Sequence, residues 1–98
     1  EGAIWDSLGY AHHQRGDYDQ AIVCYERAIA LSRVLADRFN EADTLTSLGD
    51  VHHSAGDIGA ARLVWRDALR IFDEIAHPDR EKVRAKLRAL APEVVAAC

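Results

Sequence analysis

Apolar residues recur along the chain at helical spacing, in two blocks that are nearly copies of each other. Residues 7–17 read SLGYAHHQRGD, and residues 47–57, which lie 40 positions later, read SLGDVHHSAGD. A fixed period of this length is typical of stacked supersecondary units, each of which buries its apolar face against the next. The pattern therefore predicts two tandem units of the same architecture.

Each unit reads as two helices, because apolar residues fall at i, i+3 and i+4 on both sides of a Gly-Asp turn. Gly16 and Gly56 are expected to end the first helix of each unit in a left-handed conformation. Asp17 then caps the second helix, with Gln20 where a capping box places it. The predicted helices cover about residues 2–14, 18–38, 40–54 and 58–76.

The boundary between the two units is weakly marked. Residues 34–45 read VLADRFNEADTL and contain neither Gly nor Pro. Asn40 is the N-cap that the pattern predicts, with Asp43 in the first turn of the helix that follows. The pattern also leaves open a single long helix through this boundary, which would favour domain swapping.

Small residues alternate with bulky ones in register in both units. The small positions let two helices approach closely, and they are Gly9, Ala21, Gly49 and Ala61. The bulky residues expected to fill the remaining gaps are Trp5, Tyr25 and Trp65. Such packing is needed because neither helix can bury its apolar face alone.

Residues 78–90 read PDREKVRAKLRAL and are not a third copy. Pro78 suits a first helical position, and the acidic residues after it suit a first turn. We interpret this segment as a capping helix with a solvated basic face, followed by a tail over residues 91–98. Its single apolar stripe consists of Val83, Leu87 and Leu90.

Composition narrows the class of protein. The 98 residues suffice for one domain, and no apolar run approaches the ~18 residues of a membrane span. The start, EGAIWDSLG, has no signal-peptide pattern, and the absence of any Met suggests a piece of a longer protein. Two distant cysteines fit a reducing cytoplasm, and the Arg and Ala bias is typical of a GC-rich bacterium.

The net charge of −4 conceals a polarity along the chain. Residues 1–59 carry a net charge of −6, and residues 60–98 carry +2. Such polarity matters for association, since the basic end of one copy could meet the acidic end of another.

Residues at matching positions of the two units resemble the tetratricopeptide repeat pattern. The first match comprises Trp5-x-x-Leu8-Gly9, Gly16, Tyr18, Ala21, Tyr25 and Ala28, and the second comprises Leu48-Gly49, Gly56, Ala61, Trp65 and Ala68. Leu45 stands where the family usually has Trp, and His12 and His52 stand where it has Tyr. The period of 40 is longer than the common ~34. It is similar to the repeats of kinesin light chains and of large actinobacterial antibiotic-regulatory transcription factors.

The resemblance implies an all-α, right-handed α-solenoid of two tandem helix hairpins plus a C-terminal capping helix. The single domain spans 1–98, with repeats over about 2–38 and 40–76, the capping helix over 78–90 and the tail over 91–98. It further implies protein–protein interaction by a segment of a larger bacterial transcriptional regulator in the cytoplasm. The alternative use is a structural spacer, or a self-association element that forms homo-oligomers by end-to-end packing.

The resemblance to the tetratricopeptide repeat family implies that the first helix of each unit lines a concave groove, which binds a peptide or a partner protein. Two acids in this groove, Asp6 and Asp50, would repel a carboxylate, so we expect a basic or aromatic peptide. Carried over position by position, the groove residues are Asp6, Tyr10, His13, Gln14, Asp43, Thr46, Asp50, His53 and Ser54.

The paired histidines predict no metal site. His12 and His13 point about 100° apart on a helix and cannot share one ion, and His13 and His53 would lie on adjacent helices about 10 Å apart. We expect His12 and His52 to pack within their units, and His13 and His53 to line a surface. No phosphate loop, nucleophile elbow or HExxH is present, so neither an enzyme nor a cofactor is predicted. The basic helix lacks interleaved aromatics, which argues against nucleic-acid binding.

Overall fold

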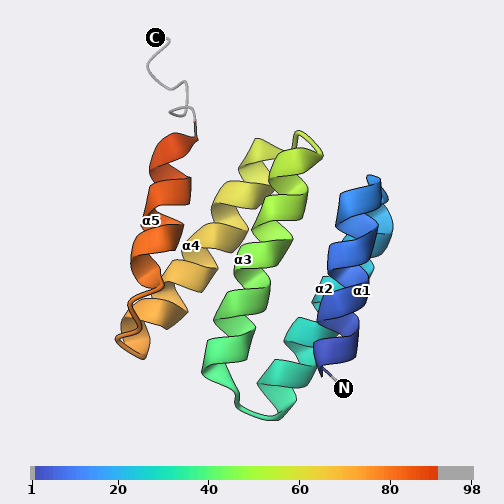
Figure 1. Cartoon of the computed structure of the whole chain (residues 1–98). Helices are drawn as coiled ribbons and strands as arrows, with labels where there is room; N and C mark the ends of the chain where they lie inside the picture. Colours follow the sequence, from blue (N-terminus) through green and yellow to red (C-terminus); the bar gives the residue numbers. More distant parts are fainter. Residues whose placement is uncertain (1, 91–98) are drawn as a thin grey trace, which may run out of the picture.

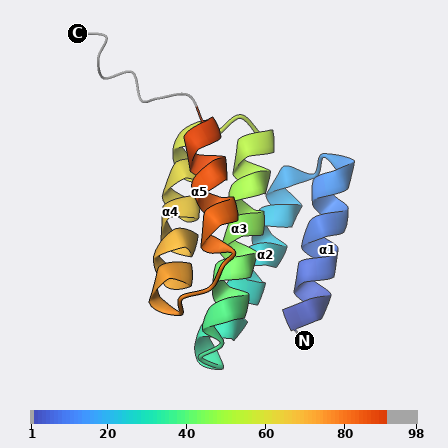
Figure 2. The same ribbon diagram turned by 60° about the vertical axis from the view of Figure 1, so that its left-hand side comes forward.

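A computed structural model describes residues 2–90, with side chains from residue 4 onward. These residues form helices and no strand: α1 (Gly2–Arg15), α2 (Tyr18–Val34), α3 (Arg38–Ser54), α4 (Ile58–Glu74) and α5 (Arg80–Ala89). Consecutive helices pack against each other in one row, with α1, α3 and α5 in front of α2 and α4 (Figure 1). In the turned view α5 lies in front of α3 and α4, and α1 stands at the opposite end of the molecule (Figure 2). This is the all-α helical-repeat solenoid that the sequence predicts; its predicted tail, 91–98, lies outside the described residues.

The two Gly-Asp turns form as expected. Gly16 has a φ of 83° and Gly56 a φ of 86°, the left-handed region where glycine is favoured. Asp57 accepts a hydrogen bond from the backbone N–H of Ala60 at 3.1 Å and thereby caps α4. Asp17 stands at the N-cap of α2, but its side chain makes no capping hydrogen bond, so the predicted capping box does not form.

The boundary between the units differs from the prediction. α2 ends at Val34 and α3 begins at Arg38, so the two separate helices that the pattern predicts do form, with earlier bounds, and the fused helix that it left open does not. The chain turns because Ala36 adopts a left-handed φ of 54°. Asp37, and not Asn40, caps α3, since its carboxylate accepts from the backbone N–H of Asn40 at 3.2 Å. The end of α4 repeats this turn, with Ala76 at a φ of 53°.

Large residues pack directly on glycines inside each unit. A Cβ added to Gly49 would lie 2.2 Å from Nε1 of Trp65, and one added to Gly9 would lie 2.8 Å from the ring of Tyr25. Both rings are buried, which confirms the predicted large-against-small packing. Trp5 is different, because it is only partly buried and carries the Arg27 guanidinium 5.0 Å from its ring centroid.

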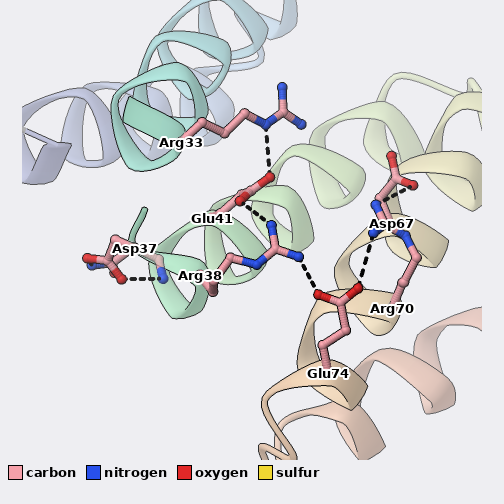
Figure 3. A network of polar contacts seen from close by, with 8 residues as sticks. Arg33, Asp37, Arg38, Glu41, Asp67, Arg70 and Glu74 are labelled. Atoms are coloured by element: carbon pink, nitrogen blue, oxygen red, sulfur yellow. Dashed lines mark hydrogen bonds and ion pairs between the residues drawn. The ribbon is translucent and has the colours of Figure 1, made fainter. Parts of the chain in front are cut away.

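A row of alternating charges joins α2, α3 and α4 (Figure 3). The buried carboxylate of Glu41 accepts from Arg33 Nε at 2.8 Å and from Arg38 Nη1 at 3.0 Å. Arg38 also donates to Glu74, which raises the pKa of Arg38 and lowers that of Glu74. Glu74 is further paired with Arg70. The row therefore connects α2 of the first unit to α3 and α4 of the second unit.

Candidate partner-binding groove

The residues predicted to bind a partner lie on two neighbouring helices, as the resemblance implies. Two hydrogen bonds join α1 to α3 directly. The Thr44 hydroxyl donates to Asp6 Oδ1 at 3.1 Å, and His13 Nε2 lies 2.8 Å from Ser54 Oγ. The predicted residues on α1 are Asp6, Tyr10, His13 and Gln14, and those on α3 are Asp43, Thr46, Asp50, His53 and Ser54. We call this face of α1 and α3, together with the adjoining face of α5, the groove.

Carboxylates in the groove are partly desolvated. Burial raises the pKa of Asp6, against the lowering effect of its hydrogen bond from Thr44. Burial also raises the pKa of Asp43, and the negative charges of Asp6 and Asp79 add to the effect, while the charges of Lys82 and His77 oppose it. Carboxylates that repel one another in a desolvated surface are stabilised by a cation. The electrostatics therefore favour a positively charged group here.

Tyr25 lies beneath the carboxylates, a position that sequence reasoning assigned to packing alone. Burial raises its pKa to about 12, opposed by a hydrogen bond with Ser47 and reinforced by the charges of Asp6 and Asp50. The phenol therefore stays protonated over the physiological range. Because Tyr25 occupies a position where the repeat places a bulky packing residue, the sequence did not indicate that its hydroxyl faces the groove residues.

Thr46 is engaged within the second unit, whereas the exposed residues among those predicted for the groove are Tyr10, Gln14, Asp43, His53 and Ser54. The Thr46 hydroxyl donates to the Ala42 carbonyl of its own helix at 2.9 Å, while its own carbonyl accepts from Trp65 Nε1 at 3.0 Å. His53 packs its ring 5.7 Å from that of Trp65. Tyr10 is 61% exposed, and Gln14 is also exposed, so both are accessible to a partner.

The capping helix takes part in the groove, contrary to the interpretation of its basic face as wholly solvated. Lys86 Nζ lies 2.9 Å from Asp50 Oδ1 and 5.6 Å from the ring centroid of Trp65. A hollow of about 270 Å³ separates α3 from α5. It is lined by Asp43, Thr46, Ser47, Asp50, Phe72, Asp79, Lys82, Val83 and Lys86. Helical periodicity could place Lys86 on a face of α5, but only the fold shows that this face meets Asp50.

The histidines are distributed among separate contacts. His12 Nδ1 is buried without a hydrogen-bond partner, and it lies 3.7 Å from Asp17 Oδ2. His77 Nδ1 accepts the backbone N–H of Asp79 at 3.0 Å, and its ring packs 4.8 Å from Phe39. Among residues 2–90, no group of three or more His, Cys, Asp or Glu side chains is placed to hold a metal ion.

Comparison with known proteins identifies the family. The tetratricopeptide repeat family matches residues 1–74, so this chain belongs to that family. Tetratricopeptide repeats are non-catalytic scaffolds for protein–protein interaction. No solved structure gives a significant match. Within the described residues, no helix is long and apolar enough to cross a membrane.

Three curated relatives share part of their sequence with this chain. A Tonsoku-like protein of Danio rerio is 29% identical over 82 residues, which are 84% of this chain and 6% of that protein. The Regulatory protein AfsR of Streptomyces griseus is 29% identical over 80 residues, 82% of this chain and 8% of its own length. A Tonsoku-like protein of Bos taurus is 35% identical over 65 residues, 66% of this chain and 5% of that protein. The chain thus spans less than a tenth of each relative.

Proposed function

We propose that the groove binds a basic or aromatic segment of a partner protein. The observation that carries the proposal is the position of Lys86, whose ammonium lies on Asp50 and over Trp65. A carboxylate beside an aromatic face is a favourable site for a cation. The chain's own lysine therefore illustrates the chemistry that a partner side chain would use in the rest of the groove.

The charges along α1 and α3 support a cationic partner over an anionic one. Asp6, Asp43 and Asp50 lie along the groove, and burial raises the pKa of the first two. A peptide ending in a free carboxylate would meet these acids, and none of the predicted groove residues on α1 and α3 is a lysine or an arginine that could receive it. Tyr10, being open to solvent, offers a ring on which an arginine or an aromatic side chain can stack.

The groove is short, and this limits the affinity of the isolated chain. Two units present only α1 and α3, and the end at α3 is partly occupied by Lys86 and Lys82 from α5. A small contact must still offset the entropy lost on association. We therefore expect modest affinity from these residues alone.

We further propose that the chain is a segment of a larger regulatory protein that acts in the cytoplasm of a bacterium. The similarity to the Regulatory protein AfsR of Streptomyces griseus supports this assignment. So does the small share of each relative that the chain spans. In such a protein, the groove would recruit the partner and another region would carry the effector activity.

Affinity capture from a GC-rich bacterial lysate tests the groove. The wild-type chain is compared with the variant Tyr10→Ala, Asp50→Ala, His53→Ala and with the control Asp19→Ala, which removes an exposed acid from α2. We expect a protein retained by the wild type and the control but lost with the groove variant, at unchanged helicity. Identical capture by all three would contradict the proposal and favour a structural spacer.

A further inference from the structure

The basic residues of α5 form two stripes, one on each side of its buried residue Val83. At 3.6 residues per turn, Arg80 and Arg84 lie on one side of Val83, and Lys82 and Lys86 lie on the other. In the turned view α5 lies in front of both α3 and α4 (Figure 2). The two stripes meet different neighbours.

The arginine stripe holds α5 on α4. Arg84 Nη2 lies 3.5 Å from Asp73 Oδ1, and Arg80 Nε lies 3.9 Å from the same oxygen atom. Val83 belongs to the hydrophobic core and supplies the apolar part of the attachment. None of these contacts involves a lysine, so replacing the lysines should leave α5 attached to α4.

The lysine stripe reaches the acids of the groove instead. Lys86 Nζ lies 2.9 Å from Asp50 Oδ1 and 5.6 Å from the ring centroid of Trp65. Lys82 and Asp43 both line the hollow of about 270 Å³ between α3 and α5. Burial raises the pKa of Asp43, and the charge of Lys82 is among those that oppose this rise. Both lysines therefore already balance carboxylates of the groove.

The lysines can leave these positions at small cost. The side chain of Lys82 is 75% exposed, and those of Lys86 and Asp50 are 36% and 37% exposed. Ion pairs that are open to solvent contribute little stability, because water and salt screen them. A lysine also binds as a point charge on a flexible stem, without the forked geometry of an arginine. A competing cation can therefore displace either ammonium group.

We propose that α5 inhibits the groove of its own chain, with Lys82 and Lys86 standing where the basic side chains of the partner bind. This inference rests on the proposed function, because it assigns a regulator to the same groove. The partner must displace both ammonium groups, so they lower its affinity. α5 itself remains on α4 during this exchange, because the arginine stripe and Val83 take no part in it.

Calorimetric titration of the whole chain with a peptide rich in arginine and tyrosine tests this inhibition. Lys82→Gln, Lys86→Gln should bind the peptide about fivefold more tightly than the wild type, because two positive charges beside the ligand are gone. This gain should shrink at high salt. Lys82→Arg, Lys86→Arg keeps both charges and should bind no more tightly than the wild type. Circular dichroism confirms that each variant keeps its helices.

A matched control and a second measurement separate local competition from net charge. Arg66→Gln, Arg88→Gln removes the same charge from exposed positions and should bind the peptide like the wild type. In nuclear magnetic resonance spectra of the wild type, the side-chain signals of Lys82 and Lys86 should shift when the peptide binds. The backbone amide signal of Val83 should stay unchanged, because α5 does not leave α4.

The outcomes distinguish this inference from the proposed function. Equal affinities of the wild type and the Lys82→Gln, Lys86→Gln variant would overturn the inhibition and leave the groove as a cation site. Weaker binding by that variant, or equal tightening by the Arg66→Gln, Arg88→Gln control, would overturn the inhibition too. Absence of binding by every protein would overturn the proposed function and the inhibition together.

Discussion

Lys86 Nζ lies 2.9 Å from Asp50 Oδ1, so the capping helix places a cation within the groove that α1 and α3 line. The same ammonium lies over the ring of Trp65. A partner with a basic side chain must therefore share or displace an interaction that the chain already makes with itself. This contact makes the proposed binding of cations in the groove testable without knowledge of the partner.

Removing this lysine should strengthen the binding of a basic peptide. Lys86→Ala frees Asp50 at little cost in stability, below about 1 kcal/mol, because both side chains are more than one third exposed. Arg88→Ala removes the same charge from an exposed position of α5 and is the matched control. Calorimetric titration with a lysine-rich peptide should give tighter binding for Lys86→Ala alone. Equal affinities would mean that Asp50 does not receive the ligand.

Gly49 should tolerate no side chain. Gly49→Ala would bring its Cβ within 2.2 Å of the buried Trp65 ring and should lower the free energy of unfolding by about 3 kcal/mol. Gly56→Ala meets no atom within 4 Å and strains only a backbone at a φ of 86°, so it should cost about 1 kcal/mol. Urea denaturation compares the two variants. A larger loss from Gly56→Ala would refute the close approach of α3 to Trp65.

Replacing the two alanines that have a left-handed φ with glycine should stabilise the chain. Ala36→Gly and Ala76→Gly relieve strain at φ values of 54° and 53°, and each should raise the free energy of unfolding by about 0.5 kcal/mol. Ala55→Gly is the control, because Ala55 follows α3 as its C-cap at a φ of −80°. Glycine relieves no strain there and only increases the conformational entropy of the unfolded chain. It should therefore destabilise the chain. Stabilisation by all three substitutions would argue against the left-handed turns.

The stability of the chain should fall in strong alkali because of Tyr25. Its pKa is raised from the ordinary value of 10.0 to about 12 in the folded state. Between these pH values the unfolded chain loses the phenol proton while the folded chain keeps it, so rising pH favours unfolding. Tyr25→Phe should remove this part of the pH dependence. Ultraviolet titration of the wild type and of Tyr25→Phe should show that the ionisation lost from the variant occurs near pH 12, and loss of an ionisation near pH 10 would contradict the assignment.

The repeat made much of the fold predictable. Two copies in register located the helices, and Gly16 and Gly56 marked their turns correctly because glycine adopts a positive φ at little cost. The break between the second and third helices was predicted a few residues too late, because an alanine takes the left-handed φ at position 36 and no local signal marks it. The capping role of Asp37 follows from that turn and was hidden with it.

The groove was less predictable than the helices. Spacing along α1 and α3 placed Asp6 and Asp50 on helices that lie side by side, but contacts between helices depend on the packed structure. Two such contacts between helices are that of Lys86 with Asp50 and that of the buried Glu41 with Arg33, and no sequence pattern predicted either one. Trp5 was expected to fill a gap inside the fold, and it is instead only partly buried, with the Arg27 guanidinium over its ring.

The most direct test of the proposed function is a calorimetric titration with two probe peptides of equal length, one rich in arginine and tyrosine and the other with glutamate in place of arginine. The wild type should bind only the basic peptide. Asp6→Asn, Asp43→Asn, which keeps the shape of both side chains, should lose most of this affinity, while Asp19→Asn should retain it. Binding of the acidic peptide, or equal binding of the basic one by all three proteins, would contradict a cation-binding groove.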